Sequence, residues 1–115
     1  MLIKRFAEAQ PYQAPNHFDM CALRLQGFEP GGPTNFWVGH SQILPGGRAG
    51  PDSSPIEKTY VMLEGELTIR AGDREEVLRA KDSVTIAPGE TREIVNQTNH
   101  VGTMLVLMPY PPASK

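Results

Sequence analysis

Residues 58–67 read Lys-Thr-Tyr-Val-Met-Leu-Glu-Gly-Glu-Leu and contain the clearest strand signal of the chain. The first six of these residues are rich in β-branched and aromatic side chains, which favour an extended backbone. Glu64-Gly65-Glu66 has the composition of a tight turn, and it predicts a hairpin between residues 58–63 and a second strand at 67–70. The stretch indicates a fold built from short strands and tight turns.

The same alternation of strands and turns continues on both sides of this stretch. Residues 35–44 form a predicted strand that ends at Pro45-Gly46-Gly47, and residues 48–55 are a predicted loop. Residues 103–108 are continuously apolar, which indicates burial on both faces, in a barrel wall or a subunit interface. The other predicted elements are strands at 18–26, 75–79, 83–86 and 92–96 and a short helical turn at 5–9. Strands spaced about ten residues apart predict an antiparallel all-β sandwich or barrel.

Composition limits the domain count and the class of protein. The chain has 115 residues, of which 11 are Pro and 11 are Gly, and this density of turn formers excludes a helical bundle. The length fits one domain over residues 1–115. The net charge of -2 offers no basic surface for nucleic acid and no polybasic membrane patch. Without a signal peptide or a long apolar run, we expect a cytoplasmic protein.

Cys21 is the only cysteine of the chain, so an intramolecular disulfide and a cysteine-based zinc cluster are excluded. It alternates in phase with Leu23 and Leu25. The pattern therefore predicts a small side chain buried in the core.

Two segments resemble the paired motifs of the cupin family, whose members are small double-stranded β-helix (jelly-roll) barrels. Residues 45–67 are similar to the first motif, with a Pro-Gly turn before a Tyr-Val-Met-Leu-Glu-Gly-Glu strand. Residues 81–96 are similar to the second motif, with Asp82, the turn Pro88-Gly89 and a terminal Asn96. The resemblance implies an all-β cupin barrel whose core spans about residues 18–108. It also implies a homodimer.

The metal-binding positions of these motifs hold other residues in this chain. Metal-binding cupins use two His and a Glu from the first motif and one His from the second. Counting from the motif glycines, Lys58 occupies the glutamate position, and Asp52 and Ser54 occupy the first two histidine positions. Arg92 occupies the third histidine position. Because Lys and Arg side chains only donate hydrogen bonds, we expect no metal or other cofactor at the standard site.

The resemblance implies that Lys58 and Arg92 point into the barrel, and period-two alternation places Tyr60 on the same face as Lys58. Two cations and a phenol in an apolar barrel suit a small carboxylate or phosphate, bound without the usual metal. The predicted ligand-binding residues are Lys58, Arg92, Tyr60, Asp52 and His40.

One alternative needs no ligand at all. In that reading Asp52 or Glu57 pairs with Lys58, and Glu90 or Glu93 pairs with Arg92, so that the barrel is simply filled.

Two other functions stay open. The first is a metal-dependent cupin enzyme of the isomerase or dioxygenase type that uses His40, Glu57 and Asp52 as shifted ligands. The second is a non-catalytic cupin that serves in structure or assembly. The remaining histidines, His17 and His100, lie in turn-like segments and are predicted to be solvated. Whether the protein is an enzyme is left open by the sequence.

Overall fold

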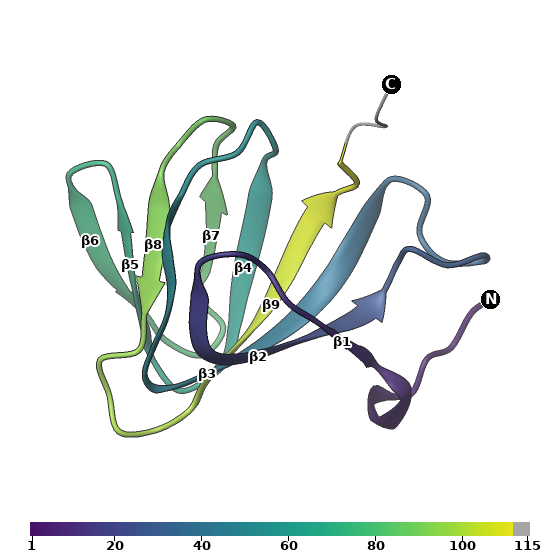
Figure 1. Cartoon of the computed structure of the whole chain (residues 1–115), viewed down its shortest axis with the longest axis horizontal. Coiled ribbons are helices and arrows are strands. Elements are labelled where there is room, and N and C mark those ends of the chain that lie inside the picture. Colours follow the sequence, from purple (N-terminus) through teal and green to yellow (C-terminus); the bar gives the residue numbers. More distant parts are fainter. Residues whose placement is uncertain (112–115) are drawn as a thin grey trace.

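A computed structural model describes residues 1–111 of the chain and shows an all-β jelly roll, as predicted (Figure 1). Every strand pair in these residues is antiparallel. The strands form one continuous sheet in the order β6-β5-β8-β3-β9-β4-β7, and β2 joins β1 to β3. The elements are η1 (Phe6–Glu8), β1 (Gln10–Tyr12), β2 (His17–Gln26), β3 (Phe36–Asp52), β4 (Lys58–Glu64), β5 (Leu67–Ala71), β6 (Arg74–Leu78), β7 (Ser83–Ile86), β8 (Arg92–Val95) and β9 (Gly102–Pro109).

The long strand β3 connects the two halves of the barrel. Its first half pairs with β9 from Phe36 to Ile43, and its second half pairs with β8 from Arg48 to Asp52. The predicted strand end at residues 45–47 is therefore wrong, and so is the predicted loop over the first residues after it. Gly46 has a φ of 80°, which lets the strand bend there and continue toward a new partner.

The predicted hairpin between residues 58–63 and 67–70 is also wrong. β4 pairs with β7 and β9, whereas β5 pairs with β6 and β8. The chain crosses between these two halves at Gly65, which has a φ of 74°. A Cβ atom at Gly65 would lie 2.5 Å from the Val101 carbonyl oxygen. The crossing therefore requires glycine both for its positive φ and for the absence of a side chain. The turn reverses the chain locally, but packing of the two halves decides which strands pair.

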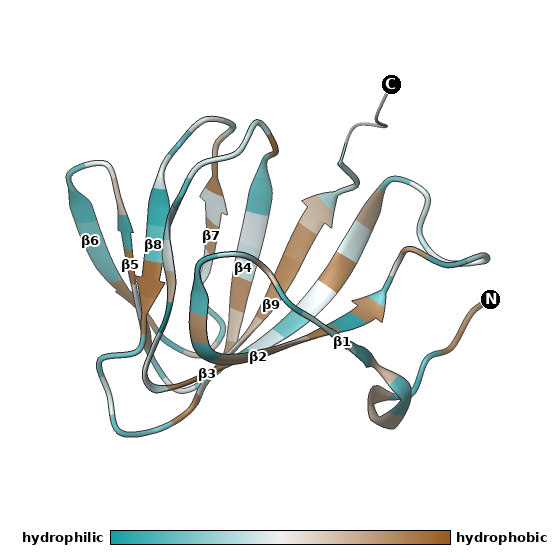
Figure 2. Cartoon of the chain, viewed as in Figure 1, coloured by the Kyte–Doolittle hydropathy of each residue, from teal (hydrophilic) through white to brown (hydrophobic). Residues whose placement is uncertain are grey.

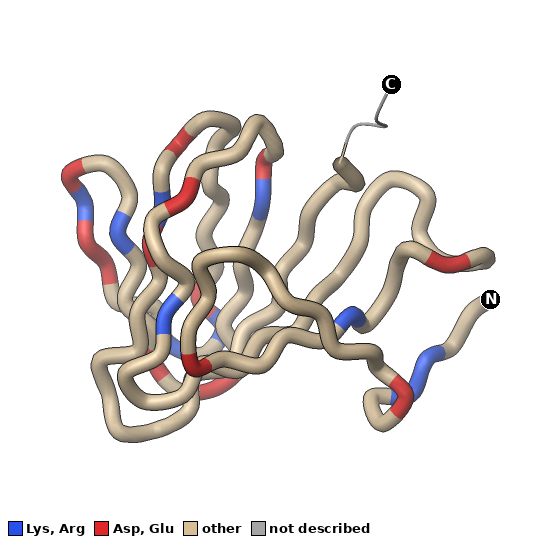
Figure 3. Tube along the Cα trace, viewed as in Figure 1, with Lys and Arg blue, Asp and Glu red and all other residues tan. Residues whose placement is uncertain are grey.

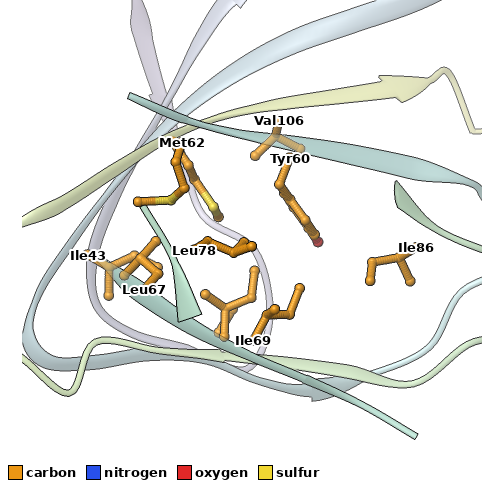
Figure 4. Packing of buried hydrophobic residues seen from close by; sticks show 11 residues of the cluster. Ile43, Tyr60, Met62, Leu67, Ile69, Leu78, Ile86 and Val106 are labelled. Carbon is orange, nitrogen blue, oxygen red and sulfur yellow. The ribbon is translucent and has the colours of Figure 1, made fainter. Parts of the chain in front are cut away.

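The core lies between these halves and draws apolar side chains from both (Figure 4). β9 lies between β3 and β4, and its residues Met104 and Val106 are buried while Leu105 and Leu107 are partly covered. Its apolar character therefore belongs to a barrel wall, and in Figure 2 it is among the most hydrophobic strands. Of the two settings predicted for this segment, a barrel wall or a subunit interface, the structure shows the first, with a strand paired on each side of β9. The homodimer stays a prediction.

Cys21 is exposed, which contradicts the prediction that it belongs to the core. The neighbouring Ala22 is buried instead, because Cys21 and Leu23 lie on the outer face of β2, where Leu23 is paired with His40 of β3. The short helical turn predicted at residues 5–9 is confirmed as η1. Within residues 1–111, no helix has the length and apolarity needed to cross a membrane.

Asn96 is a buried polar residue of the barrel wall and is only 1% exposed. Its amide nitrogen donates to the Ile43 carbonyl at 2.8 Å and to the His100 carbonyl at 2.7 Å. Its amide oxygen accepts from the backbone nitrogen of Thr98 at 2.9 Å and from the Thr98 hydroxyl at 2.8 Å. The side chain uses its full bonding capacity to connect β3 with the turn before β9.

Replacing Asn96 by Ala leaves several partly buried backbone groups without partners. We expect Asn96→Ala to lower the free energy of unfolding by roughly 2–4 kcal/mol, measured by urea denaturation. Asn99→Ala is the matched control, because Asn99 is exposed in the same turn. Equal stability of the two variants would show that the Asn96 hydrogen bonds contribute nothing.

Candidate functional site

A cavity of about 220 Å³ lies in the barrel, between the two halves of the sheet. Its wall is largely apolar, with Met20, Trp37, Met104 and Val106 among its side chains. Polar groups reach it from β2, β3, β4 and β8. A groove of about 380 Å³ also runs along β6 and β7, but its charged residues are exposed or half-exposed. The cavity is therefore the place where buried ionisable groups converge.

Lys58 and Arg92 are the two cations of this cavity, and they are only 4% and 5% exposed. Each is the first residue of its strand, β4 and β8, and these strand starts lie at the same end of the barrel (Figure 1). Figure 2 shows β8 changing from hydrophilic at its start to hydrophobic at its end. Period-two alternation turns both cations inward, as predicted. The buried residues that share their faces are Tyr60, Met62, Ile94 and Asn96.

Arg92 is held by two neutral oxygens. Its Nε donates to the Tyr60 hydroxyl at 2.9 Å, and its Nη1 donates to the Gly50 carbonyl at 2.9 Å. Tyr60 reaches into the interior from β4, with its hydroxyl oxygen at the tip of the side chain (Figure 4). The guanidinium therefore connects three strands, β8, β4 and β3.

Neither cation has a carboxylate within 4.0 Å among residues 1–111, so the alternative in which ion pairs fill the barrel is wrong. Glu93 pairs with Arg70 at 2.8 Å, and Glu90 accepts a hydrogen bond from the Ala87 backbone. Glu57 is exposed and lies outside the cavity. Acidic and basic residues instead mix on the surface, most visibly over the β5–β6 hairpin (Figure 3).

The predicted residue Asp52 also lines the cavity, at the end of β3 and opposite Arg92 in the strand register. His40 does not: it lies on the outer face of β3, with its ring centre 5.0 Å from that of Phe6. Its place as a predicted ligand-binding residue in this pocket is therefore wrong. The inward face of the strand belongs to Trp37, Ser41 and Ile43.

His17 is one of the polar cavity residues that the sequence did not reveal, as are Tyr12 and Ser41. His17 was predicted to be solvated, but it is half-buried and lines the cavity, whereas His100 is exposed as predicted. Its Nδ1 lies 2.7 Å from the Pro15 carbonyl oxygen. The pairing of His17 with Ala49 of β3 brings it to the cavity, and no local pattern signals such a long-range register.

The comparisons with known proteins agree with this architecture. Residues 39–108 match the Cupin_2 family, described as a cupin domain. The chain is a cupin. A relative named a β-D-galactosidase, from Mycobacterium tuberculosis, is 42% identical over 113 residues, which cover 98% of this cupin and 97% of the relative.

Solved structures with this fold share less sequence. The polyketide cyclase RemF from Streptomyces resistomycificus superposes with a TM-score of 0.84 at 20% identity, over 95% of this cupin and 79% of that chain. A predicted oxalate decarboxylase from Thermotoga maritima gives a TM-score of 0.79 at 19% identity, over 96% of this cupin and 100% of that chain. At these identities the likeness concerns the fold alone.

The donor set of the cavity does not fit the divalent metal found in many cupins. Lys58 and Arg92 bring positive charge and only donate hydrogen bonds, while Asp52 and His17 are the cavity's carboxylate and imidazole. The alternative ligands His40, Glu57 and Asp52 are not brought together. No group of three or more His, Cys, Asp or Glu side chains in residues 1–111 is arranged to hold a metal ion.

Burial and neighbouring charge set the protonation of these groups. Burial lowers the pKa of Lys58 below its ordinary value, the charge of Arg92 lowers it further, and Asp52 opposes both. Burial raises the pKa of Tyr60, and Arg92 opposes that rise. Burial also lowers the pKa of His17, its bond to Pro15 opposes this, and Arg92 adds to the lowering. At neutral pH the imidazole is therefore neutral, and Tyr60 carries its proton.

A desolvated Lys58 beside Arg92 costs folding free energy, and the structure shows no ion pair of Lys58 within residues 1–111 to offset it. We expect Lys58→Met to raise the melting temperature at pH 7 by about 2–5 °C, as measured by calorimetry. The folded-state pKa of Lys58 is the lower one, so this gain shrinks as the pH rises toward 10.5.

Lys81→Met is the control for this prediction, because the Lys81 side chain is exposed. A loss of stability in Lys58→Met alone would mean that Lys58 is stabilised within the fold.

Proposed function

We propose that this cupin binds a small anion, a carboxylate or a phosphate, between Lys58 and Arg92. The observation that carries the proposal is the placement of two buried cations at one cavity with no carboxylate paired to either within residues 1–111. Buried charges are ordinarily paired, so an anionic ligand supplies the missing counter-charge. A barrel with a purely structural role has no need of such a cavity.

The shape of the cavity limits the ligand. Its volume of about 220 Å³ is below the range of roughly 300–1,000 Å³ typical of pockets for drug-sized molecules. The part of the ligand that the cavity holds is therefore no larger than about one sugar ring. Arg92 uses its Nε–H for Tyr60 and one Nη1–H for Gly50, which leaves the second Nη1–H, both Nη2–H groups and the Lys58 ammonium to donate to the anion. The apolar wall receives the carbon skeleton.

Removal of either cation tests the proposal. We expect Arg92→Ala and Lys58→Met each to weaken the binding of small carboxylates or phosphate at least tenfold, because a charge-assisted hydrogen bond is lost in a desolvated site. Titration calorimetry of hits from a thermal-shift screen of small carboxylates and phosphates measures this. Arg74→Ala is the control, since Arg74 is exposed and lies outside the cavity.

Unchanged affinity in a folded Lys58→Met variant would rule out the anion pocket. Lys58→Met covers the case in which Arg92→Ala, by freeing Tyr60 and the Gly50 carbonyl, fails to fold. Elemental analysis of tag-free protein offered Zn, Mn, Fe and Ni separates this proposal from the metal-dependent alternative. We expect far less than one metal per chain, and a stoichiometric metal would instead implicate Asp52 and His17.

A second candidate function is hydrolysis of a β-D-galactoside. It is supported by the name of the Mycobacterium tuberculosis relative, which is similar over nearly the whole of both chains. Glycosidases commonly use two carboxyl groups, one as an acid and one as a nucleophile or base. Asp52 is the carboxylate among the described residues that line the cavity. In this candidate, Tyr60 or His17 would take the place of the second group.

Hydrolysis of 4-nitrophenyl β-D-galactopyranoside tests this candidate. We expect Asp52→Asn to lower the rate by about 10²-fold or more, because a catalytic carboxylate typically contributes at least that factor. Asp73→Asn is the control, since Asp73 is exposed in the β5–β6 turn. A rate that survives Asp52→Asn would place the activity elsewhere or assign it to a contaminant.

A further inference from the structure

The cavity holds hydrogen-bond acceptors as well as cations. Asp52 is exposed to solvent on one side and lines the cavity with a carboxylate that has no ion pair within residues 1–111, although Asp52 lies opposite Arg92 in the strand register. A simple anion at Lys58 and Arg92 would share this small space with the negative charge of Asp52. Hydroxyl groups on the ligand remove the conflict, because they donate hydrogen bonds to the carboxylate.

His17 supplies a second acceptor, and its hydrogen bond to Pro15 identifies which ring nitrogen accepts. The Pro15 carbonyl can only accept a hydrogen bond, so the 2.7 Å contact requires the hydrogen of the His17 ring to be on Nδ1. In the neutral ring, Nε2 then has a free lone pair. Burial and the charge of Arg92 favour this neutral form.

Backbone hydrogen bonds of Gly50 fix the position of His17 relative to Arg92. The Asn16 carbonyl accepts from the Gly50 nitrogen at 2.8 Å, and the Asn16 side chain donates to the Pro51 carbonyl at 3.1 Å. The carbonyl of the same Gly50 accepts from Arg92. A Cβ atom on Gly50 would lie 2.4 Å from the Asn16 side chain, so only glycine allows this close contact. The acceptor and the cation are therefore positioned by one residue of β3.

From this arrangement we infer that the ligand is a hydroxylated anion, with its anionic group at Lys58 and Arg92 and its hydroxyl groups donating to His17 and Asp52. The chemical class comprises hydroxy acids, uronic acids and sugar phosphates of no more than one ring. The inference rests on the proposed anion site and adds His17 as a residue that determines specificity.

Three matched probes test separately the anionic group and the hydroxyl groups of the inferred ligand. D-Galacturonate carries the ring, the hydroxyls and a carboxylate, D-galactose lacks the carboxylate, and tetrahydropyran-2-carboxylate lacks the hydroxyls. We expect D-galacturonate to bind at least tenfold more tightly than either of the others in titration calorimetry. D-Glycerate and α-D-galactose 1-phosphate extend the test to a smaller acid and to a phosphate.

Two variants locate the hydroxyl contacts. His17→Asn retains an amide that can donate to the Pro15 carbonyl but lacks an acceptor at the position of Nε2, and Asp52→Asn removes the carboxylate. We expect each to weaken the binding of D-galacturonate about tenfold, which corresponds to about 1.4 kcal/mol. The binding of tetrahydropyran-2-carboxylate should stay within about twofold in His17→Asn and should not weaken in Asp52→Asn, which removes a repulsive charge.

The outcomes are distinguishable from failure of the anion site itself. If tetrahydropyran-2-carboxylate binds as tightly as D-galacturonate, and Lys58→Met weakens both, the anion site stands and the inference about hydroxyl groups is overturned. If D-galactose binds as tightly as D-galacturonate, both fail. Absence of binding for D-galacturonate, D-glycerate and α-D-galactose 1-phosphate up to ~10 mM, well beyond ordinary ligand affinities, also overturns the inference.

Discussion

The interior of this cupin depends on the hydrogen bonds made by the buried guanidinium of Arg92. It bonds to Tyr60 on β4 and to the Gly50 carbonyl on β3, so one cation from β8 links three strands across the barrel. Both partners are neutral oxygens, which satisfy hydrogen bonds but leave the charge uncompensated. This imbalance gives the cavity its positive character.

Lys58 increases the imbalance, since it enters the same cavity from the opposite half of the barrel. A fold that only needed to be stable would have an apolar residue at this position. Retaining two desolvated cations beside each other is a cost typical of binding and catalytic sites, where stability is exchanged for function. The same reasoning applies to the neutral His17, whose half-buried ring lines the cavity directly after Asn16, a residue with a φ of 60°.

The outcome for particular residues shows how far sequence patterns reach. Lys58, Tyr60 and Arg92 were placed correctly on the inward faces, because side-chain direction in a strand alternates locally and the motif positions set its phase. For His40 the strand pattern left both faces open, and the structure places its ring on the outer face, beside Phe6. His17 was missed because its position depends on pairing between β2 and β3, which no short segment specifies.

The resemblance to cupins pointed to a barrel with Lys58 and Arg92 inside it. Taken alone, the sequence determined an antiparallel all-β fold with strands and turns near most of their observed positions. These features depend on local composition, on turn chemistry and on two-residue alternation. Only the tertiary structure decided that β4 and β5 belong to different halves, that β3 bends and exchanges partners, and that His17 joins Asp52 at the cavity. Each of these depends on contacts between segments far apart in the chain, where burial of the shared core outweighs the preference of any single turn.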